Sequence, residues 1–497
     1  MERPILNQNL ARVSPMQFGA VADGKTNDSA AILEAVKVAR EEDKLLVLPE
    51  GEYYVDQIIV LNNVNVLSEN AKILFYGMER SKPAVWMQDN VNIFGTIRIW
   101  IVDNTKDGTV NHGGRCNMGF GVYEDGAGAH HCYVENVEVT GGYENQNGIL
   151  MTGDTSDVLI DRVYTPNGEN YGRVVLLHWG NAKDHFPIGE WSVENGYGHV
   201  DGWKPTQFPH DIKIGLIEGE NVGSAIDKKY QGEGAFHIAA GYNIEVDELR
   251  FRNCGAAMCI TGGDCGFEYG TDADKAHKQS NIRIHKLFAT GVRFAAIYHV
   301  GYMLMDMKKS VDTDVIVDEI YAEASTATVA LITYSAKHFE VKKATLKGFT
   351  NYALQVDGEN RNVKIGTMNL ENGSSNAAIF LEHTGKVGRP DKLTIDTLNL
   401  KNCRNDKAAI INVRQGAELK VGTINAENVC AKSVLALEKG NDFDSICIDT
   451  VNLQNVEGIQ AMVDVQAAVA ADRKVCIGAI NADLPVTMGE HCDVKLG

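Results

Sequence analysis

A ten-residue pattern recurs along the C-terminal part of the chain, and it restricts the fold more than any other feature of the sequence. Each copy alternates apolar with other residues and then carries Thr or Ala, an apolar residue and Asn. The copies begin 30, 26, 27 and 29 residues apart. They occupy residues 363–372, 393–402, 419–428, 446–455 and, in a shortened form, 475–483.

A second short apolar segment lies between successive copies, for example at 257–261, 296–300 and 352–356. Both kinds of segment are bounded by Gly, Asn or Asp, which is typical of strands that end at turns. Two short strands with their turns in each repeat indicate one coil of a β-solenoid. The sequence therefore predicts an all-β chain whose coils bury their apolar faces against one another.

One Asn occupies the same position in every copy of the pattern. Stacked amides bond to one another when identical residues lie in register, so the repeat predicts an amide ladder that faces inward or lines a turn. The residues are Asn369, Asn399, Asn425, Asn452 and Asn481.

The N-terminal segment predicts a cap for the open end of the solenoid core. Ile32, Ala35 and Val36 recur at helical spacing and indicate an amphipathic helix over 28–40, with Asp28 or Asn27 as its N-cap. We expect residues 1–55 to form this cap and the first strands. Residues 56–497 are then the solenoid, with a long loop insertion at about 178–211.

The charge balance excludes several classes of partner. The chain has 47 basic and 66 acidic side chains, and 47 − 66 gives a net charge of −19. Nucleic-acid binding needs clustered basic residues, so no nucleic-acid partner is expected.

No apolar run is long enough to span a membrane. The N-terminus has no signal-peptide pattern, which favours the cytoplasm or a phage virion unless a signal peptide has been removed.

The ten Cys are scattered and form no paired CxxC motif. Several lie within apolar strand-like runs, which favours buried free thiols made in a reducing compartment. The spacing of Cys254, Cys259 and Cys265 fits no common zinc pattern, so neither a metal site nor a cofactor is expected.

Two segments near the N-terminus resemble the opening of a known superfamily. They read Phe-Gly-Ala-Val-Ala-Asp-Gly-Lys-Thr-Asn-Asp-Ser-Ala-Ala-Ile at 18–32 and Leu-Leu-Val-Leu-Pro-Glu-Gly-Glu-Tyr-Tyr-Val at 45–55. This is similar to the pectate-lyase superfamily of right-handed parallel β-helices. That group includes polygalacturonase-like hydrolases, polysaccharide lyases, uronate epimerases and phage tailspike depolymerases. The resemblance implies a single right-handed parallel β-helix and does not specify the reaction.

The active-site motifs of the polygalacturonases do not carry over to this chain. Residues 146–149 read Gln-Asn-Gly-Ile and lack the Asp of that family's Asn-Thr-Asp-Gly segment, and there is no Asp-Asp pair and no Gly-His-Gly. The Asp-Pro-His segment of alginate epimerases is absent too; residues 208–211 resemble it only superficially. Pectin is therefore not a supported substrate.

One region interrupts the repeat rhythm. Residues 178–237 hold three of the five Trp and five of the fourteen His. A long loop on a solenoid commonly carries a binding face, and flat aromatic rings suit the apolar face of a sugar ring. Packing within the loop is the alternative role for these aromatics. The predicted substrate-binding residues here are Trp179, Trp191, Trp203, Tyr197, Asp201 and Lys228.

The charged residues of this region favour one reaction class over another. Residues 178–237 contain five Lys, four Asp, five Glu and no Arg. Arg is the preferred partner of a substrate carboxylate, so its absence disfavours a uronate lyase and favours a neutral or weakly charged glycan. Hydrolysis of a glycoside needs two carboxyl groups, which the region supplies.

Alignment of the strand copies provides the catalytic candidates. Leu150, His237, Cys259 and Tyr298 fall at equivalent outward positions, which adds Tyr298 to the substrate-binding residues. An acid/base pair is expected from Asp227, Glu233 and Asp264, with His237 and His178 orienting substrate or tuning a carboxyl pKa. The alternatives are turn-capping or solvated carboxylates and structural His.

Three functions are consistent with these observations. The leading one is a glycoside hydrolase that cleaves a polysaccharide or oligosaccharide. A polysaccharide lyase or uronate C5-epimerase is the second, and the third is a tailspike-like glycan-binding rod without catalysis, which would be expected to form a homotrimer.

Overall fold

The structure is a computed structural model that describes most of the chain between Glu2 and Ala482. The chain divides into two compact units: unit 1 comprises Met1–Gly255 with Phe267–Ala276, and unit 2 comprises Ala256–Gly266 with His277–Gly497. The residues outside the description are 1, 77–82, 103–115, 122–127, 142–145, 169–170, 179–208, 223–233, 262–277, 301–311, 327–328, 335, 359, 375–376, 383–388, 405–406, 460, 467–472 and 483–497.

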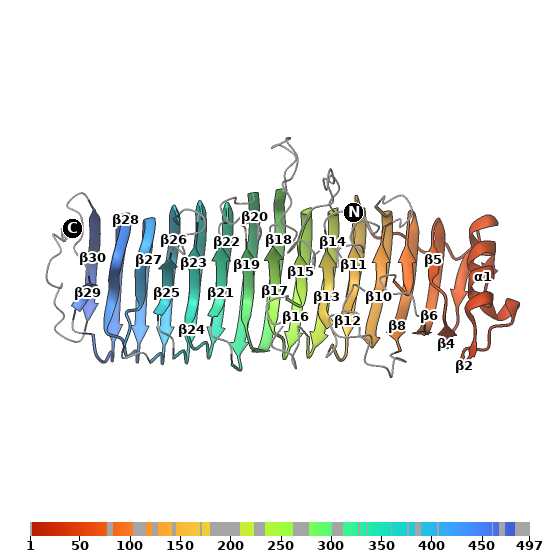
Figure 1. Cartoon of the computed structure of the whole chain (residues 1–497), viewed down its shortest axis with the longest axis horizontal. Helices are drawn as coiled ribbons and strands as arrows, with labels where there is room; N and C mark the ends of the chain where they lie inside the picture. Colours follow the sequence, from red (N-terminus) through yellow and green to blue (C-terminus); the bar gives the residue numbers. More distant parts are fainter. Residues whose placement is uncertain are drawn as a thin grey trace, which may run out of the picture. The chain divides into compact units, whose positions relative to one another are not determined.

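Unit 1 consists of two stacks of parallel strands, coloured red to yellow-green in Figure 1. The short strands pair in the order β5 (Ile59–Leu61), β7 (Val85–Met87), β9 (Cys116–Phe120), β11 (Gln146–Met151), β13 (Tyr171–Leu177) and β15 (Phe236–Ile238). The long strands pair in the order β6 (Val64–Phe75), β8 (Val91–Ile101), β10 (His130–Gly141), β12 (Ser156–Thr165), β14 (His210–Glu220) and β16 (Tyr242–Arg252). The first coil is completed by β1 (Arg12–Val13), β2 (Asp23–Asn27), β3 (Leu45–Leu48) and β4 (Gly51–Val55).

Unit 2 repeats this arrangement. Its short strands are β17 (Ala256–Thr261), β19 (Ala295–Val300), β21 (Val329–Tyr334), β23 (Tyr352–Asp357), β25 (Ala377–Glu382) and β29 (Ala461–Val465). Its long strands are β18 (Lys278–Val292), β20 (Asp312–Ala324), β22 (His338–Lys347), β24 (Asn362–Glu371), β26 (Lys392–Lys401) and β30 (Lys474–Ala482). Two further strands, β27 (Ile411–Glu427) and β28 (Ser433–Gln454), each run through both stacks. Both units are therefore parallel β-helices, as the repeat predicts.

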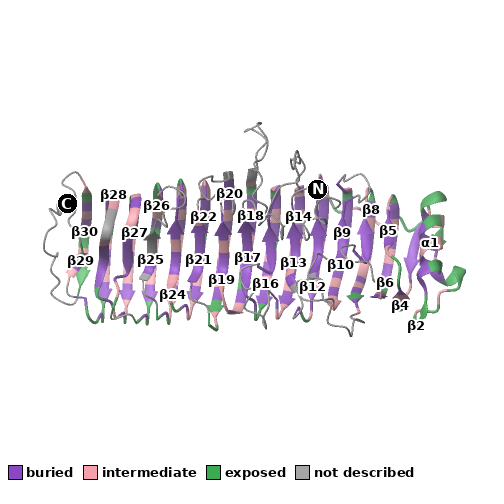
Figure 2. Cartoon of the chain, viewed as in Figure 1, coloured by how far each residue is buried: buried purple, intermediate pink, exposed green. Residues whose placement is uncertain are grey.

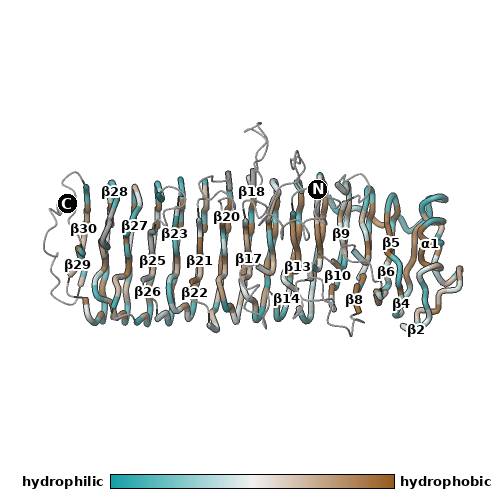
Figure 3. Tube along the Cα trace, viewed as in Figure 1, coloured by the Kyte–Doolittle hydropathy of each residue, from teal (hydrophilic) through white to brown (hydrophobic). Residues whose placement is uncertain are grey.

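The core of each unit contains a column of identical or similar apolar residues in register. Figure 2 shows that the strands are largely buried, and Figure 3 shows apolar segments along them in brown. Every member of the column is at most 1% exposed. Because each coil contributes one side chain to the column, the apolar face of a coil is buried by its neighbours. The column of unit 1 is Val66, Ile93, Val134, Ile160, Ile214 and Val246. That of unit 2 is Ile284, Val317, Val341, Ile365, Ile395, Val421, Ile448 and Ile477.

The predicted Asn ladder is present in unit 2. The Asn399 amide donates to Asn369 Oδ1 at 2.8 Å, Asn425 to Asn399 at 2.7 Å, Asn452 to Asn425 at 2.7 Å and Asn481 to Asn452 at 2.8 Å. The expectation that it faces inward or lines a turn is wrong. Asn369 lies mid-strand between the buried Met368 and Leu370, so it projects from the outer face.

The final Asn of each repeat has a different role. Asn372, Asn402, Asn428 and Asn455 adopt positive φ values of 54°, 53°, 54° and 51°. Asn tolerates the left-handed region better than most residues because its short side chain bonds locally. These residues therefore turn the chain at the end of each long strand, which explains why the repeat requires Asn there.

The predicted helix is α1 (Ser29–Glu41), which follows the short 3-10 helix η1 (Pro15–Phe18). It buries Ala31, Ile32, Ala35, Val36 and Ala39 and contacts β1, β3, β5 and β6. Its role as a cap of the core and the domain boundary at residue 55 stay predictions. None of the described helices is long and apolar enough to cross a membrane.

Asp28 fixes the segment that precedes this helix. It occupies the N-cap position, but its carboxylate makes no capping bond to the helix. It accepts instead from the backbone N–H of Val21 at 2.8 Å and of Ala22 at 3.2 Å, while Asn27 Oδ1 accepts from Ser29 N–H at 3.0 Å. Asn27 therefore provides the side-chain bond to the start of the helix, and Asp28 bonds the segment before it.

A buried polar network crosses the interior of unit 2. His299 is fully buried, its Nδ1 lies 3.1 Å from Thr333 Oγ1, and that hydroxyl donates to Asn360 Oδ1 at 3.1 Å. Burial lowers the pKa of His299 to about 3, because the imidazolium would lose its hydration. The ring is therefore neutral in the folded chain at neutral pH.

This network predicts a loss of stability in acid. The unfolded ring binds a proton near pH 6.5 and the folded ring only near 3, so stability that is complete above pH 6.5 falls as the pH drops towards 3. One pKa unit corresponds to about 1.4 kcal/mol, and the unfolded ring is already half protonated at pH 6.5, so His299 should cost unit 2 roughly 2 kcal/mol between pH 6.5 and 4.5. Urea unfolding followed at both pH values measures this fall.

His299→Asn should lessen the acid loss, because the variant has no ring to protonate. His131→Asn is the matched control, since His131 is 65% exposed and already has the positive φ that Asn tolerates. An equal acid loss in the wild type and in His299→Asn would contradict the prediction.

Candidate functional site

The short strands of unit 1 carry a polar cluster on the face opposite the apolar columns, called the outer face below. Leu150, Leu176 and His237 lie in register on β11, β13 and β15, and the parallel apolar column is Ile149, Val175 and Phe236. The predicted equivalence of Leu150 and His237 is confirmed, with Leu176 between them. In unit 2, Cys259 and Tyr298 are likewise in register.

Three polar side chains from successive coils meet at this face and form the Arg173 cluster. The Arg173 guanidinium donates from Nε to His237 Nδ1 at 3.1 Å and from Nη1 to Asn147 Oδ1 at 3.4 Å. His237 and Asn147 are each 2% exposed, whereas Arg173 is half-buried. Arg173 is therefore the member of the cluster that a ligand would meet first.

His237 is held as a neutral ring by this arrangement. Burial, together with the positive charge of Arg173, keeps the pKa of His237 well below its ordinary value. Its Nδ1 accepts the bond from Arg173, so the proton of the neutral ring is on Nε2. His237 thus positions Arg173 and does not act as a base through Nδ1.

His178 lies at the end of β13, where the interruption of the repeat begins. It is 7% exposed, and its backbone N–H donates to the Met151 carbonyl at 2.9 Å. The interruption ends at β14, whose first residue is His210.

His210 belongs to a second polar group, at the turn that precedes the long strands. Its ring stacks on Tyr242 with centroids 4.7 Å apart, and its Nδ1 lies 2.7 Å from Asp211 Oδ2. Its Nε2 lies 3.6 Å from Asp154 Oδ1. The hydrogen bond from His210 is the main cause that lowers the pKa of Asp211, so the Asp211 carboxylate stays ionised beside the His210 ring.

Tyr298 lies in unit 2 within an aromatic group. Its ring packs edge-on against Phe294 at 5.2 Å and against Tyr334 at 6.2 Å. These rings and Tyr352 are partly buried and cover the buried Ala295, Val329 and Ile332. Partly exposed aromatic faces of this kind suit stacking on a sugar ring.

Most of the predicted site residues fall in segments that the structure does not describe. Of the twelve candidates, only His178, His237 and Tyr298 can be placed. The roles of the others stay predictions. Those outside the described residues are Asp227, Glu233, Asp264, Trp179, Trp191, Trp203, Tyr197, Asp201 and Lys228.

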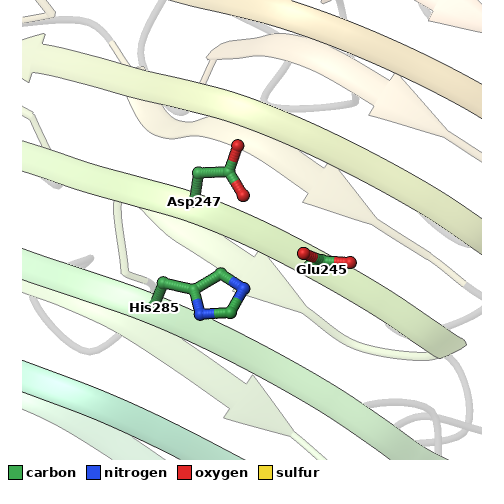
Figure 4. A group of neighbouring side chains, drawn as sticks. All are labelled: Glu245, Asp247 and His285. Atoms are coloured by element: carbon green, nitrogen blue, oxygen red, sulfur yellow. The ribbon is translucent and has the colours of Figure 1, made fainter. Parts of the chain in front are cut away.

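Acidic and His side chains also project from the long strands, as Figure 4 shows for Glu245, Asp247 and His285. In unit 1, Lys213 Nζ lies 3.0 Å from Glu245 Oε1 and 3.6 Å from Asp247 Oδ1. In unit 2, His285 Nδ1 lies 2.7 Å from Asp318 Oδ2. Each of these groups therefore has an ion-pair partner within its own unit.

Asp318 contacts three side chains of neighbouring long strands in unit 2. Burial opposes its ionisation, but bonds from Lys342, His285 and Arg283 outweigh this and lower the pKa of Asp318 to about 2. A carboxylate held ionised by Arg283, Lys342 and the His285 ring joins neighbouring long strands and is unsuited to acid catalysis.

Two members of the Arg173 cluster, Arg173 and Asn147, were not among the predicted site residues. Arg173 lies five positions before the window 178–237, whose lack of Arg favoured a neutral glycan. The structure brings Arg173 against His237. The only signal in the sequence was a charged residue within an otherwise apolar strand.

Comparison with known proteins finds distantly similar solved structures. No protein-family model and no curated protein sequence matches this chain. Among solved structures, the surface protein and adhesin PfbA of Streptococcus pneumoniae shares 14% identity over 95% of this chain and 100% of its own, with a TM-score of 0.46. The Dettilon tailspike protein shares 16% over 88% of this chain and 68% of its own, with a TM-score of 0.47.

The Family 28 exopolygalacturonase of Yersinia enterocolitica shares 10% identity over 93% of this chain and 79% of its own, with a TM-score of 0.26. At such identities no residue's role is carried over from these proteins. The all-β parallel coils seen in both units are the architecture that the resemblance to the pectate-lyase superfamily implies.

Proposed function

We propose that the chain is a carbohydrate-active enzyme whose site lies on the outer face of β11, β13 and β15. The observation that supports this is the Arg173 cluster, in which three successive coils hold a cation at the start of the aromatic-rich interruption. A fixed guanidinium next to a neutral His and an Asn is suited to hold an anionic or hydroxyl-rich ligand. The Trp and Tyr of residues 178–211 are proposed to line its sugar subsites.

Hydrolysis of a polysaccharide or oligosaccharide is the leading reaction in this proposal. It needs one protonated carboxyl group to donate to the leaving oxygen and one carboxylate to act as base or nucleophile. Asp227 and Glu233 precede β15 in the sequence, and Asp264 follows β17. We propose that the pair comes from these three residues.

The substrate is proposed to carry an acidic group, in place of the neutral glycan that the residue counts favour. Arg173 would help to neutralise that group, since among the described residues it is a cation held next to His237 and Asn147. The same observation favours a second candidate, a lyase or C5-epimerase on a uronate, since removing the proton beside a carboxylate requires neutralisation of its charge.

A glycan-binding rod without catalysis is the third candidate, and the aromatic group around Tyr298 favours it. Such a group supplies affinity without acid/base chemistry. Assembly as a homotrimer belongs to this candidate.

A panel of neutral and acidic glycans incubated with the protein separates these functions by mass spectrometry. Products heavier by one water indicate hydrolysis, unsaturated products that absorb ultraviolet light indicate a lyase, and an uncleaved isomer indicates an epimerase. Binding with unchanged glycans would overturn the enzymatic proposal.

The catalytic assignment is tested with Asp227→Asn, Glu233→Gln and Asp264→Asn, made separately. Loss of an acid or base should lower kcat by about 10²- to 10⁴-fold. Glu427→Gln is the control, because Glu427 forms an ion pair with Lys401 on the outer face of a long strand. Normal turnover in all three variants would remove these residues from the site.

A further inference from the structure

Two cysteines face each other on adjacent strands at the C-terminal coils of unit 2. Cys447 on β28 lies in register with Cys476 on β30, and, besides burial, the neighbouring Cys476 is one of the causes that raise the pKa of the Cys447 thiol. Both are half-buried, whereas Cys403 is buried. Among the described strands this is the one pair of cysteines in register.

The geometry of the pair suits a covalent bond between the sulfurs. Neighbouring strands lie about 4.8 Å apart, which is within the 4.4–6.8 Å that Cα atoms of a disulfide span. In parallel strands the two Cα–Cβ bonds of an in-register pair point the same way, so rotation about χ1 brings the sulfurs together. The Cβ atoms then also lie about 4.8 Å apart, so closure needs them to approach by about 1 Å to reach the mean separation of about 3.8 Å in disulfides.

The surroundings leave the pair accessible from outside the coil. Cys447 lies between the buried Ile446 and Ile448, and Cys476 between the buried Val475 and Ile477. Both thiols therefore project from the outer face, away from the apolar column. A small oxidant reaches them without disrupting the core.

We propose that Cys447 and Cys476 are a reversible oxidation site that closes to an interstrand disulfide by exchange with a low-molecular-weight disulfide of the glutathione class. One cysteine thiolate attacks the small disulfide, forms a mixed disulfide and releases one small thiolate. The second cysteine thiolate attacks the protein sulfur of the mixed disulfide and releases the other. The cysteine pair loses two electrons and two protons, and one small disulfide becomes two thiols.

The reaction should accelerate as the pH rises. Burial and the neighbouring Cys476 raise the pKa of the Cys447 thiol, and the charge of Lys420 only partly offsets this. The attacking species is the thiolate, so a thiol with a raised pKa reacts faster in alkaline solution.

The disulfide would tie the last described strand to the rest of the unit. β30 pairs with β28 on one side, and the structure describes no strand on its other side. An end strand held by one ladder opens more readily than an internal strand. A covalent bond to β28 limits this opening and closes the chain between residues 447 and 476 into a loop.

Peptide mapping of the full-length protein after treatment with oxidised glutathione at pH 8 tests the proposal. We expect a Cys447–Cys476 disulfide, reversed by dithiothreitol, and slower amide exchange in β30 of the oxidised protein. Cys447→Ser and Cys476→Ser should each accumulate a glutathione adduct on the remaining cysteine of the pair.

Cys430→Ser is the matched control, because Cys430 is also half-buried but its backbone pairs with Arg404 and Glu457 and not with another cysteine. It should leave the disulfide unchanged. Separate glutathione adducts on both cysteines of the wild type, a disulfide to another cysteine, or no reaction at either thiol would overturn the proposal.

Discussion

Arg173→Gln should lower kcat/KM for the substrate found in the glycan panel by about 10²-fold or more. The variant removes a positive charge that Asn147 and His237 hold on the outer face of unit 1, and one preorganised charge contributes about this factor in enzyme sites. Arg173→Lys should retain only part of the activity, because an ammonium group cannot reproduce the planar fork of a guanidinium. Steady-state kinetics and substrate affinity of the purified variants provide the measurement.

The control for this experiment is another arginine of unit 1. Arg162→Gln removes a charge that pairs with Glu218 on the outer face of β12, and it should leave kcat/KM within about twofold because β12 belongs to the long strands and not to β11, β13 and β15. Full activity in Arg173→Gln would place the site elsewhere. Loss of activity together with loss of fold would be recognised from thermal unfolding, and Arg173→Lys would then decide the result.

Asp28→Ala should lower the free energy of unfolding of unit 1 by roughly 3 kcal/mol. Asp28 is 1% exposed, and each of its carboxylate oxygens accepts a backbone N–H from the segment before α1. Hydrogen bonds to charged groups contribute about 1.5 to 3 kcal/mol each, and the variant loses two. Urea unfolding and amide exchange at Val21 and Ala22 would record the loss.

Two further variants examine the cause of this effect. Asp28→Asn keeps one acceptor oxygen and should lose about half as much stability. Asp23→Ala should have a smaller effect, although Asp23 Oδ1 also accepts two backbone N–H groups, because Asp23 is exposed to water. Equal destabilisation by Asp23→Ala and Asp28→Ala would show that burial of Asp28 is not the reason.

The coils could be predicted from the sequence because the repeat determines them locally. Ile365, Ile395, Val421 and Ile448 occur at the same place in successive copies, and the structure stacks them in that register. The ladder of Asn side chains followed from the same spacing. The face from which these side chains project could not be predicted, because a shift of one residue exchanges the inner and outer faces of a strand.

The candidate site was harder to predict because it joins residues far apart in the sequence. Arg173 and His237 are 64 positions apart, yet β13 and β15 are neighbours in the stack of short strands, and β14 lies between them in the sequence. The sequence places His237 on a strand but does not show which earlier strand lies beside it. The composition counted over 178–237 therefore did not include the charge of Arg173.

The Asn ladder also has a direction. In each bond from Asn399 to Asn481, the amide of the later coil donates to the carbonyl oxygen of the earlier coil. The side-chain dipoles consequently add head to tail, in the way that peptide dipoles add along a helix. The two ends of the ladder therefore differ. The amide of its first residue, Asn369, donates to Thr345 Oγ1, whereas the side-chain carbonyl of its last residue, Asn481, is a hydrogen-bond acceptor. A polar group that packs against Asn481 therefore binds more favourably if it donates a hydrogen bond than if it accepts one.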